Sequence, residues 1–417
     1  MNPAVTSARI PRLLGLSRGL RGLVQGFLLA VFLPDLHALG WSSLTMGEAL
    51  SGGLLADFLL TLVVGPLSDR ISPRHLLMAG ELASAASALP FLVDPSPLAL
   101  GLSIFLAGAG QRSNGSPGPW APSEQVLLAR QPVFSRPFLH FGVNMSLGLA
   151  GMGSGALLAF FSPSDPLKSL REGLAGLFFL SLLTFFLAAL LPPEPVPPPR
   201  SPDPSPAPSG SRPLPERRKL LLLVFLNVAG GLSIGLLDPV IAYWFLIRFH
   251  TGPGQTALFL APAFFSAALV SFLLGRLNRL SPMTGLVLSI LGISFFSGLL
   301  LPLSSSFGLA VLLYTVRLSG IKAAGGVRQA LALSLVPLRK KGQAASLHLS
   351  SLNAAQIAGP LLSGLLFHSG QTETPLILSG ILSGLSLVLF YLLYRSAQPK
   401  KEGARPLEAP FDPERTS

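Results

Sequence analysis

Residues 46–94 read MGEALSGGLLADFLLTLVVGPLSDRISPRHLLMAGELASAASALPFLVD, two apolar stretches on either side of a short basic turn. Each stretch has roughly the 20 residues that a helix needs to cross the ~30 Å hydrocarbon core of a bilayer. The turn carries Arg70 and Arg74. This pattern predicts a helical hairpin in a membrane, and it recurs along the chain.

The composition of the whole chain is that of a protein solvated by lipid. Of its 417 residues, 50% are hydrophobic and 12% are charged, whereas soluble domains carry roughly 25% charged residues. The 43 Gly and 39 Pro residues fit membrane helices, which tolerate both. Because the chain has no Cys, disulfides, thiol catalysis and Cys-ligated metals are excluded. We expect the net charge of +12 to lie at the cytoplasmic membrane face and not to bind nucleic acid.

Twelve apolar segments are long enough to span a membrane. They lie near residues 14–39, 46–68, 75–94, 97–122, 138–161, 170–191, 220–247, 255–277, 283–303, 307–336, 343–367 and 374–395. We therefore expect an all-α integral membrane protein with twelve transmembrane helices in two pseudo-symmetric six-helix bundles. The expected parts are an N-terminal bundle at 1–191, a Pro-rich cytoplasmic linker at 192–219, a C-terminal bundle at 220–395 and a disordered cytoplasmic tail at 396–417.

The Lys and Arg residues predict the orientation of this bundle. With twelve spans, 21 of them fall on the side of the two termini, 3 in the opposite loops and 6 within helices. Because cytoplasmic loops carry an excess of Lys and Arg, both termini are expected in the cytoplasm. The predicted location is the cell (inner or plasma) membrane.

The two halves echo one another at a spacing of about 205 residues. The matching pairs are Pro34-Asp35 with Asp238-Pro239, Gly65–Pro73 with Gly275–Pro282, Arg112 and Gly115 with Arg317 and Gly320, and Leu139-His140 with Leu347-His348. Duplicated six-helix halves with a site between them are the architecture of many secondary transporters.

The turn Gly65-Pro-Leu-Ser-Asp-Arg-Ile-Ser-Pro-Arg74 resembles a signature of the major facilitator superfamily, G-x-L-a-D-R-x-G-R-R/K, between helices 2 and 3. Residues Gly65, Leu67, Asp69, Arg70 and Arg74 match, whereas Ser72 and Pro73 depart from the usual Gly and Arg. The resemblance implies a transporter, and a gating motif of Gly65, Asp69, Arg70 and Arg74 that stabilises its outward-facing state. The alternative is that Arg70 and Arg74 only supply cytoplasmic charge.

Two further segments resemble motifs within that family. The run Arg112-Ser-Asn-Gly-Ser-Pro-Gly118 is similar to the R-x-x-Q-G-x-G motif of proton-coupled members, but it is one residue short and has Asn114 in place of Gln. The glycines at 148–155 and 359–364 resemble the glycine-rich motif of exporters. The alternative is that they only let helices pack closely.

Ionisable groups inside membrane spans are costly, so each is a candidate for function. The candidates for substrate binding or proton coupling are Asp35, Asp57, Glu81, Arg112, Asp238 and Arg317. Asp35 and Asp238 stand beside prolines that can bend the first and seventh spans at a central cavity. Lys322 is a further candidate to face the cavity. Asp57 or Glu81 can instead pair with Arg112 as a structural tie. Arg18, Arg21 and Arg328 are expected to extend to the inner interface, and His140 and His348 to sit at solvated helix ends.

The sequence has no motif of an enzyme or of a nucleotide-binding site, so we expect neither catalysis nor a cofactor or metal. Three functions remain open. The first is proton-coupled export of small organic molecules by alternating access, and the second is import or exchange of organic anions. The third is a membrane sensor that does not transport. The expected partners are a small-molecule substrate, protons and the lipid bilayer, and the protein is expected to be a monomer.

Overall fold

The computed structural model describes residues 3–68, 70–107, 118–129, 137–192, 216–276, 280–334 and 341–397, and these residues form helices and short connections without a strand. The first half contains α1 (Pro3–Ala38), α2 (Ser43–Leu67), α3 (Pro73–Val93), α4 (Pro97–Ala107), α5 (Ala121–Ala129), α6 (Pro137–Leu158) and α7 (Pro166–Ala189). The second half contains α8 (Glu216–Leu237), α9 (Ile241–Phe249), α10 (Pro253–Arg276), α11 (Leu280–Leu300), α12 (Phe307–Ser334), α13 (Lys341–His368) and α14 (Thr374–Ala397). The predicted all-α fold is confirmed.

Local sequence signals set several helix ends. The Ser42 hydroxyl caps α2 by accepting a hydrogen bond from the backbone N–H of Thr45 at 3.1 Å. Asp165 caps α7 through the N–H of Leu167 at 3.0 Å, with Pro166 in the first turn. Gly40 has φ of +84°, a backbone conformation that favours glycine, and it ends the turn between α1 and α2.

Among the described residues, nine helices are long and apolar enough to cross a membrane, and the bent pair α8–α9 makes a tenth. The remaining two expected spans, the fourth and the eleventh, are not among these ten. The fourth is divided into α4 and α5, with residues 108–117 between them outside the described part, and the eleventh corresponds to α13. The arrangement is consistent with twelve spans.

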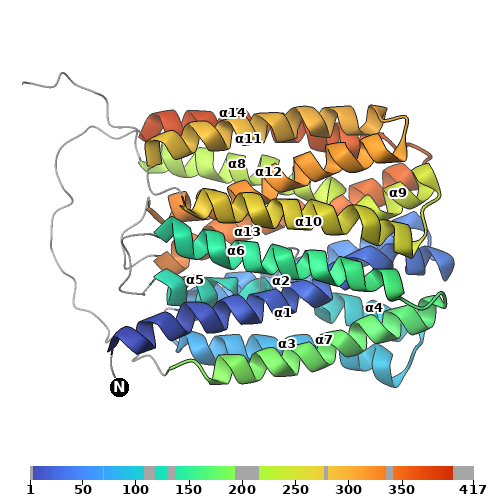
Figure 1. The fold of residues 1–417 in the computed structure, drawn as a ribbon, viewed down its shortest axis with the longest axis horizontal. Coiled ribbons are helices and arrows are strands. Elements are labelled where there is room, and N and C mark those ends of the chain that lie inside the picture. The colour runs from blue at the N-terminus through green and yellow to red at the C-terminus, as the bar shows by residue number, and fades with distance from the viewer. Residues whose placement is uncertain are drawn as a thin grey trace, which may run out of the picture.

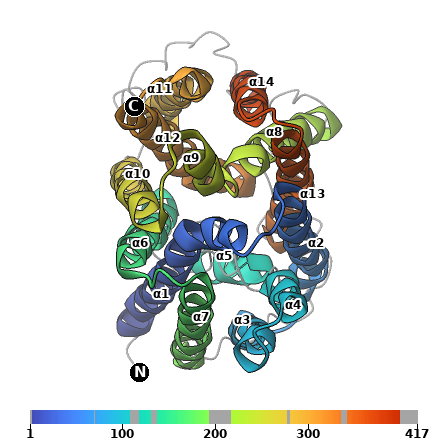
Figure 2. The same ribbon diagram turned by 90° about the vertical axis from the view of Figure 1, so that its right-hand side faces the viewer.

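The helices run side by side in one bundle (Figure 1). The start of α1, the end of α7 and the start of α8 lie at one end, which we call the inner end. The opposite end, which holds the α1–α2 turn and the α13–α14 turn, is the outer end. Viewed from that end, α1, α3, α4 and α7 lie on one side, and α8, α11, α12 and α14 lie on the other (Figure 2).

Two helix pairs make most of the contact between the halves, α2 with α13 and α6 with α10. In the repeat, the second expected span corresponds to the eighth and the fifth to the eleventh. The pairs α2–α13 and α6–α10 therefore exchange with one another under the internal two-fold symmetry, as expected for pseudo-symmetric halves.

Glycines permit the closest helix contacts within each half. A Cβ atom on Gly151 of α6 would collide with the backbone of Gly19 in α1, and one on Gly359 of α13 would collide with Gly235 in α8. These two pairs occupy equivalent places in the repeat. The glycine-rich segments thus bring helix backbones together, as the packing alternative expected, and their role in export stays a prediction.

At the outer end the two halves touch directly. The Ser43 hydroxyl donates to the carbonyl of Gly364 at 3.3 Å, and Ser51 accepts from the N–H of Leu361 at 3.1 Å. The ring of Tyr243 lies edge-on to His37 at 5.4 Å. These contacts join α1 and α2 to α9 and α13 at the outer end.

Candidate functional site

A cavity of about 360 Å³ lies between the two halves and is lined by residues from both. Most of its wall is apolar, including side chains of Phe32, Met145 and Phe264. Its polar lining consists of Arg18, Gln25, Ser103, Gln125, Asn227, Asp238, Tyr314, Lys322 and Gln356. A mostly apolar cavity with a few polar groups is the usual form of a small-molecule site.

The C-terminal wall of this cavity holds a buried charge cluster of Asp238, Arg317 and Lys322. Arg317 Nη1 lies 3.0 Å from Asp238 Oδ1, and Lys322 Nζ lies 2.7 Å from Asp238 Oδ2. Arg317 also donates to the hydroxyl of Ser379 on α14 at 2.9 Å. All three charged side chains are at least nine-tenths buried. The structure therefore brings together the predicted Asp238 and Arg317, and it places Lys322 in the cavity wall as expected.

The chain breaks at Asp238 in the way that the sequence predicted for the seventh span. Helix α8 ends at Leu237, Pro239 follows, and α9 continues at an angle of 41°. Because Pro cannot continue the helical hydrogen bonding, it favours such a bend. The break lets the Asp238 side chain reach the cavity.

Asp35, the predicted counterpart of Asp238, lies in a different setting. Helix α1 runs unbroken through Pro34 to Ala38, so the expected bend is not found there. Asp35 is buried near the outer end beside Ser169 of α7, and it does not line the cavity described above. Its role in proton coupling stays a prediction.

A second buried cluster lies within the N-terminal half. Glu124 of α5 accepts from Arg18 and from Arg21, each at 2.8 Å, and Arg21 also pairs with Glu81 of α3 at 2.5 Å. Thr184 of α7 donates to Glu81 at 2.6 Å. Two cations and two carboxylates balance here, and the network ties α1, α3, α5 and α7 together.

This network corrects one sequence prediction. Arg18 and Arg21 do not extend to the membrane interface, because they are 9% and 8% exposed and have carboxylate partners inside the bundle. The side chain of Arg328 lies outside the described residues. Buried Arg residues can stay away from the interface where carboxylates satisfy their donors.

The alternative interpretation of Glu81 was a structural ion pair with Arg112. Glu81 does form a buried ion pair, but its partner is Arg21. The expected partner, Arg112, lies outside the described residues, as do Asn114 and Gly115. Sequence reasoning missed Glu124, which follows the polar segment at the end of the expected fourth span. The apolar run at 126–129 after it is the signal that a helix continues.

Asp57 of α2 is fully buried and links the two halves. Its Oδ2 accepts a hydrogen bond from Asn353 of α13 at 3.0 Å. This contact lies farther from the outer end than Ser43 and Gly364, on the same pair of helices. The pairing partner was not predictable, because Asn353 is 296 residues away in the sequence.

The structure describes part of the predicted gating motif. Gly65 is buried in the last turn of α2, where its carbonyl accepts from Ser68 at 2.6 Å, and Arg70 is exposed. Arg74 donates to the carbonyl of Ala189, in the last turn of α7, at 2.6 Å. A cation at a helix C-terminus is favourable, so Arg74 fastens the start of α3 to α7 within one half. Asp69 lies outside the described residues.

Comparison with known proteins agrees with this architecture. Residues 14–335 and 223–416 match the family model of the Major Facilitator Superfamily. A search of curated proteins finds no match.

Solved transporters have the same fold. The human organic anion transporter MFSD10 (TETRAN) is 18% identical, with a TM-score of 0.68 over 93% of this chain and 99% of that one. The transporter FucP in its outward conformation is 14% identical, with a TM-score of 0.64 over 93% and 99%. A mutant of the nucleoside transporter NupG is 14% identical, with a TM-score of 0.62 over 93% and 100%. The chain therefore belongs to the Major Facilitator Superfamily and is a multi-pass membrane transporter of a small solute, not an enzyme.

Proposed function

We propose that the protein carries a small organic anion with an apolar body through the central cavity by alternating access. The observation that carries this proposal is the sharing of one carboxylate, that of Asp238, by two buried cations, Arg317 and Lys322. The apolar lining suits the body of the solute. The negative charge of the solute can pair with Arg317 or Lys322 when that cation leaves Asp238.

The sequence around the cluster strengthens the argument. Asp238 is the only Asp or Glu between residues 217 and 372. Arg317 and Lys322 therefore have one carboxylate between them in this part of the chain, whereas Arg18 and Arg21 are balanced by Glu81 and Glu124. An anion that binds at Lys322 compensates the excess positive charge of the C-terminal wall.

Proton-coupled export of cationic or neutral molecules is the second candidate. One observation favours it: Asp35 is buried, and its Oδ2 has no hydrogen-bond partner among the described residues. A buried carboxylate with an unsatisfied oxygen can carry a proton during transport. Asp238 can act in the same way when a substrate displaces Lys322.

Transport by reconstituted protein separates the two candidates. Proteoliposomes with an internal pH-sensitive dye would be supplied with labelled aromatic carboxylates, aromatic amines and uncharged amphiphiles. We expect uptake of the carboxylates. We also expect Lys322→Gln to raise KM roughly 30-fold, the effect of losing about 2 kcal/mol from a buried charge contact, and Lys322→Arg to retain most of the activity.

Lys168→Gln is the matched control, because Lys168 is 75% exposed near the outer end, and it should leave transport unchanged. Preference for amines, with proton flux that is lost in Asp35→Asn or Asp238→Asn and kept in Lys322→Gln, would overturn the anion proposal in favour of export. Transport of none of the three classes would count against both.

We propose that both termini face the cytoplasm of a cell whose inner or plasma membrane holds the protein. The excess of Lys and Arg at the inner end supports this orientation. A single chain supplies both walls of the cavity, which supports a monomer as the transporting unit. The domain boundaries at the linker, and gating by Gly65, Asp69, Arg70 and Arg74, are part of the same proposal.

A further inference from the structure

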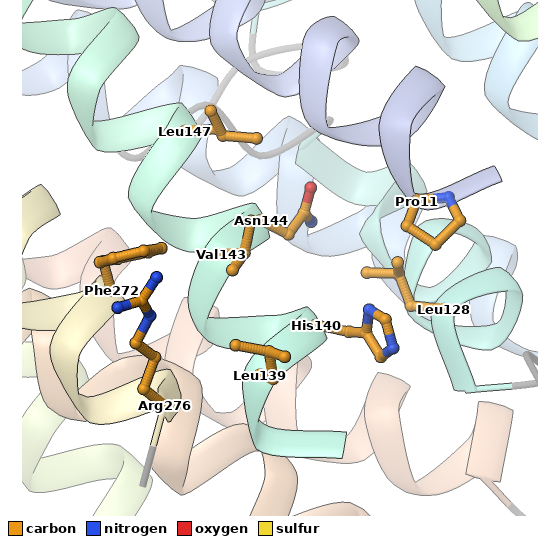
Figure 3. Close-up of a pocket in the computed structure, with 9 residues that line it drawn as sticks. All are labelled: Pro11, Leu128, Leu139, His140, Val143, Asn144, Leu147, Phe272 and Arg276. Atoms are coloured by element: carbon orange, nitrogen blue, oxygen red, sulfur yellow. The ribbon is translucent and has the colours of Figure 1, made fainter. Parts of the chain in front are cut away.

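A groove separate from the central cavity lies near the inner end (Figure 3). It has a volume of about 520 Å³ and runs along one face of α6, with α10 on one side and α1 and α5 on the other. Because α6 belongs to the N-terminal half and α10 to the C-terminal half, the groove lies across the junction of the halves. Its volume falls in the range of small-molecule sites.

The groove faces the surroundings of the bundle, which in a membrane are lipid chains. Leu147 of α6 lines it and is 42% exposed, and Leu16 of α1 and Leu273 of α10 are 54% and 52% exposed. Large exposed apolar side chains on three neighbouring helices are typical of a surface in contact with hydrocarbon. An acyl chain can therefore enter the groove from the bilayer.

Polar groups at the inner end of the groove favour an anion. Arg276 lies at the end of α10, where its guanidinium is held over the ring of Phe272 at 4.4 Å. Arg9 and Arg12, both exposed, flank the lining residue Pro11 on α1. Basic groups at this depth attract anionic headgroups.

Two buried polar atoms of the lining residues also lack partners among the described residues. His140 Nε2 is one, which differs from the solvated helix end expected from the sequence. The other is Oδ1 of Asn144, a residue that is 5% exposed and whose amide nitrogen donates to Glu124. Buried polar atoms in proteins are normally hydrogen-bonded. A phosphate can accept from His140, and a headgroup hydroxyl can donate to Asn144.

We propose that this groove binds an anionic glycerophospholipid with a hydroxylated headgroup, of the phosphatidylglycerol type, from the leaflet at the inner end. Its headgroup extends along the inner end of the groove from Arg276 to His140, with the phosphate at Arg276, and an acyl chain follows Val143, Leu147 and Phe272. Because Arg276 and His140 belong to different halves, the bound lipid bridges them. The lipid therefore stabilises the arrangement in which α6 and α10 meet at this end, and its removal shifts the conformational equilibrium.

Native mass spectrometry of the detergent-purified full chain tests the proposal with phosphatidylglycerol and phosphatidylcholine as probes. We expect preferential retention of phosphatidylglycerol. We expect its affinity to fall about fivefold for each positive group lost, as for other basic residues at membrane surfaces. Arg276→Gln is the main variant, and Arg248→Gln, an exposed Arg near the outer end, is the matched control.

Val143→Trp tests the apolar part of the site, because it fills the groove while leaving every charge in place. It should also weaken retention of phosphatidylglycerol, and glycerol 1-phosphate should compete poorly because it has no acyl chains. Equal retention of both lipids, retention that Arg276→Gln and Val143→Trp leave unchanged, or full competition by glycerol 1-phosphate would overturn the proposal. Scanning fluorimetry without added lipid would verify that each variant is folded.

Discussion

At the scale of single residues, the buried charges pair between helices that are far apart in the sequence. Glu124 joins Arg18 and Arg21 across 106 and 103 positions of the chain. No local pattern encodes contacts over such distances, because they depend on how α1, α3 and α5 pack. The composition of the C-terminal half is more informative about pairing. Because Asp238 is the only Asp or Glu between residues 217 and 372, it is the one carboxylate that this stretch offers to Arg317 and Lys322.

Loss of the Glu124 carboxylate should destabilise the fold strongly. Glu124→Ala leaves Arg18 and Arg21 buried without the carboxylate that binds both, and breaking a buried ion pair in this way costs about 3–5 kcal/mol. We expect a marked fall of the thermal unfolding midpoint in detergent, measured by intrinsic fluorescence.

Arg248→Ala is the control for that measurement. Arg248 is 43% exposed and lies 3.8 Å from Glu373, and such surface pairs contribute below about 1 kcal/mol. Equal midpoints for Glu124→Ala and the parent protein would show that the N-terminal cluster does not hold its helices together.

At the scale of elements, hydropathy located the helices well, because a lipid solvent demands about 20 apolar residues for each span. It was less informative where a span is not one regular helix. The fourth expected span is divided into α4 and α5, and the seventh bends between α8 and α9. Pro239 signalled the second case, but Pro34 gave the same signal in α1 and no break occurs there. A proline alone does not decide whether a helix bends, because neighbouring helices can hold it straight.

The contact of α1 with α6 should depend on the absence of a side chain at Gly155. A Cβ atom there would collide with the carbonyl oxygen of Leu23 in α1. We expect Gly155→Val to destabilise the protein by about 1–3 kcal/mol through overpacking, measured as a lower thermal midpoint and a lower yield of monodisperse protein.

Gly176→Val provides the comparison, because Gly176 also lies within a long apolar helix, but a Cβ atom added there would meet nothing within 4 Å. Both changes alter helix propensity equally. If Gly155→Val were no worse than Gly176→Val, close packing of α1 on α6 would not be required, and a role of this glycine in export would regain weight.

At the scale of the whole molecule, the repeat in the sequence predicted two pseudo-symmetric halves, and the exchange of the pairs α2–α13 and α6–α10 agrees with it. The repeat did not predict which end of the bundle is closed, because the two halves can meet at either end in a rocking transporter. The contact of Ser43 with Gly364 and that of His37 with Tyr243 show that the halves meet at the outer end.

Locking the outer end should stop transport. A Cβ atom on Gly364 would lie 2.6 Å from the carbonyl oxygen of Ser43, so α2 and α13 must move slightly apart to admit a side chain there. Because the Ser43 hydroxyl contacts Gly364, Ser43→Cys with Gly364→Cys still places two thiols at one contact, and oxidation should join them. The native chain has no Cys, which makes the cross-link specific. We expect solute uptake to be abolished by oxidant and restored by reductant.

Ser43→Cys alone should remain active under both conditions. Full activity of the oxidised double variant, with the cross-link verified by mass spectrometry, would show that the halves need not separate at this end. That result would contradict alternating access through the central cavity.

The unequal charge and shape of the two halves has an evolutionary consequence. The halves repeat one six-helix pattern, yet among the described residues the bend occurs only in the second half. The two buried cations of the second half share a single carboxylate, whereas those of the first half have two. After a gene duplication, one half can keep a structural role while the other half changes the solute that it binds. Changes of solute preference among descendants should therefore accumulate in the cavity-lining parts of α8, α10, α12 and α13, and changes around Glu124 should affect every solute alike.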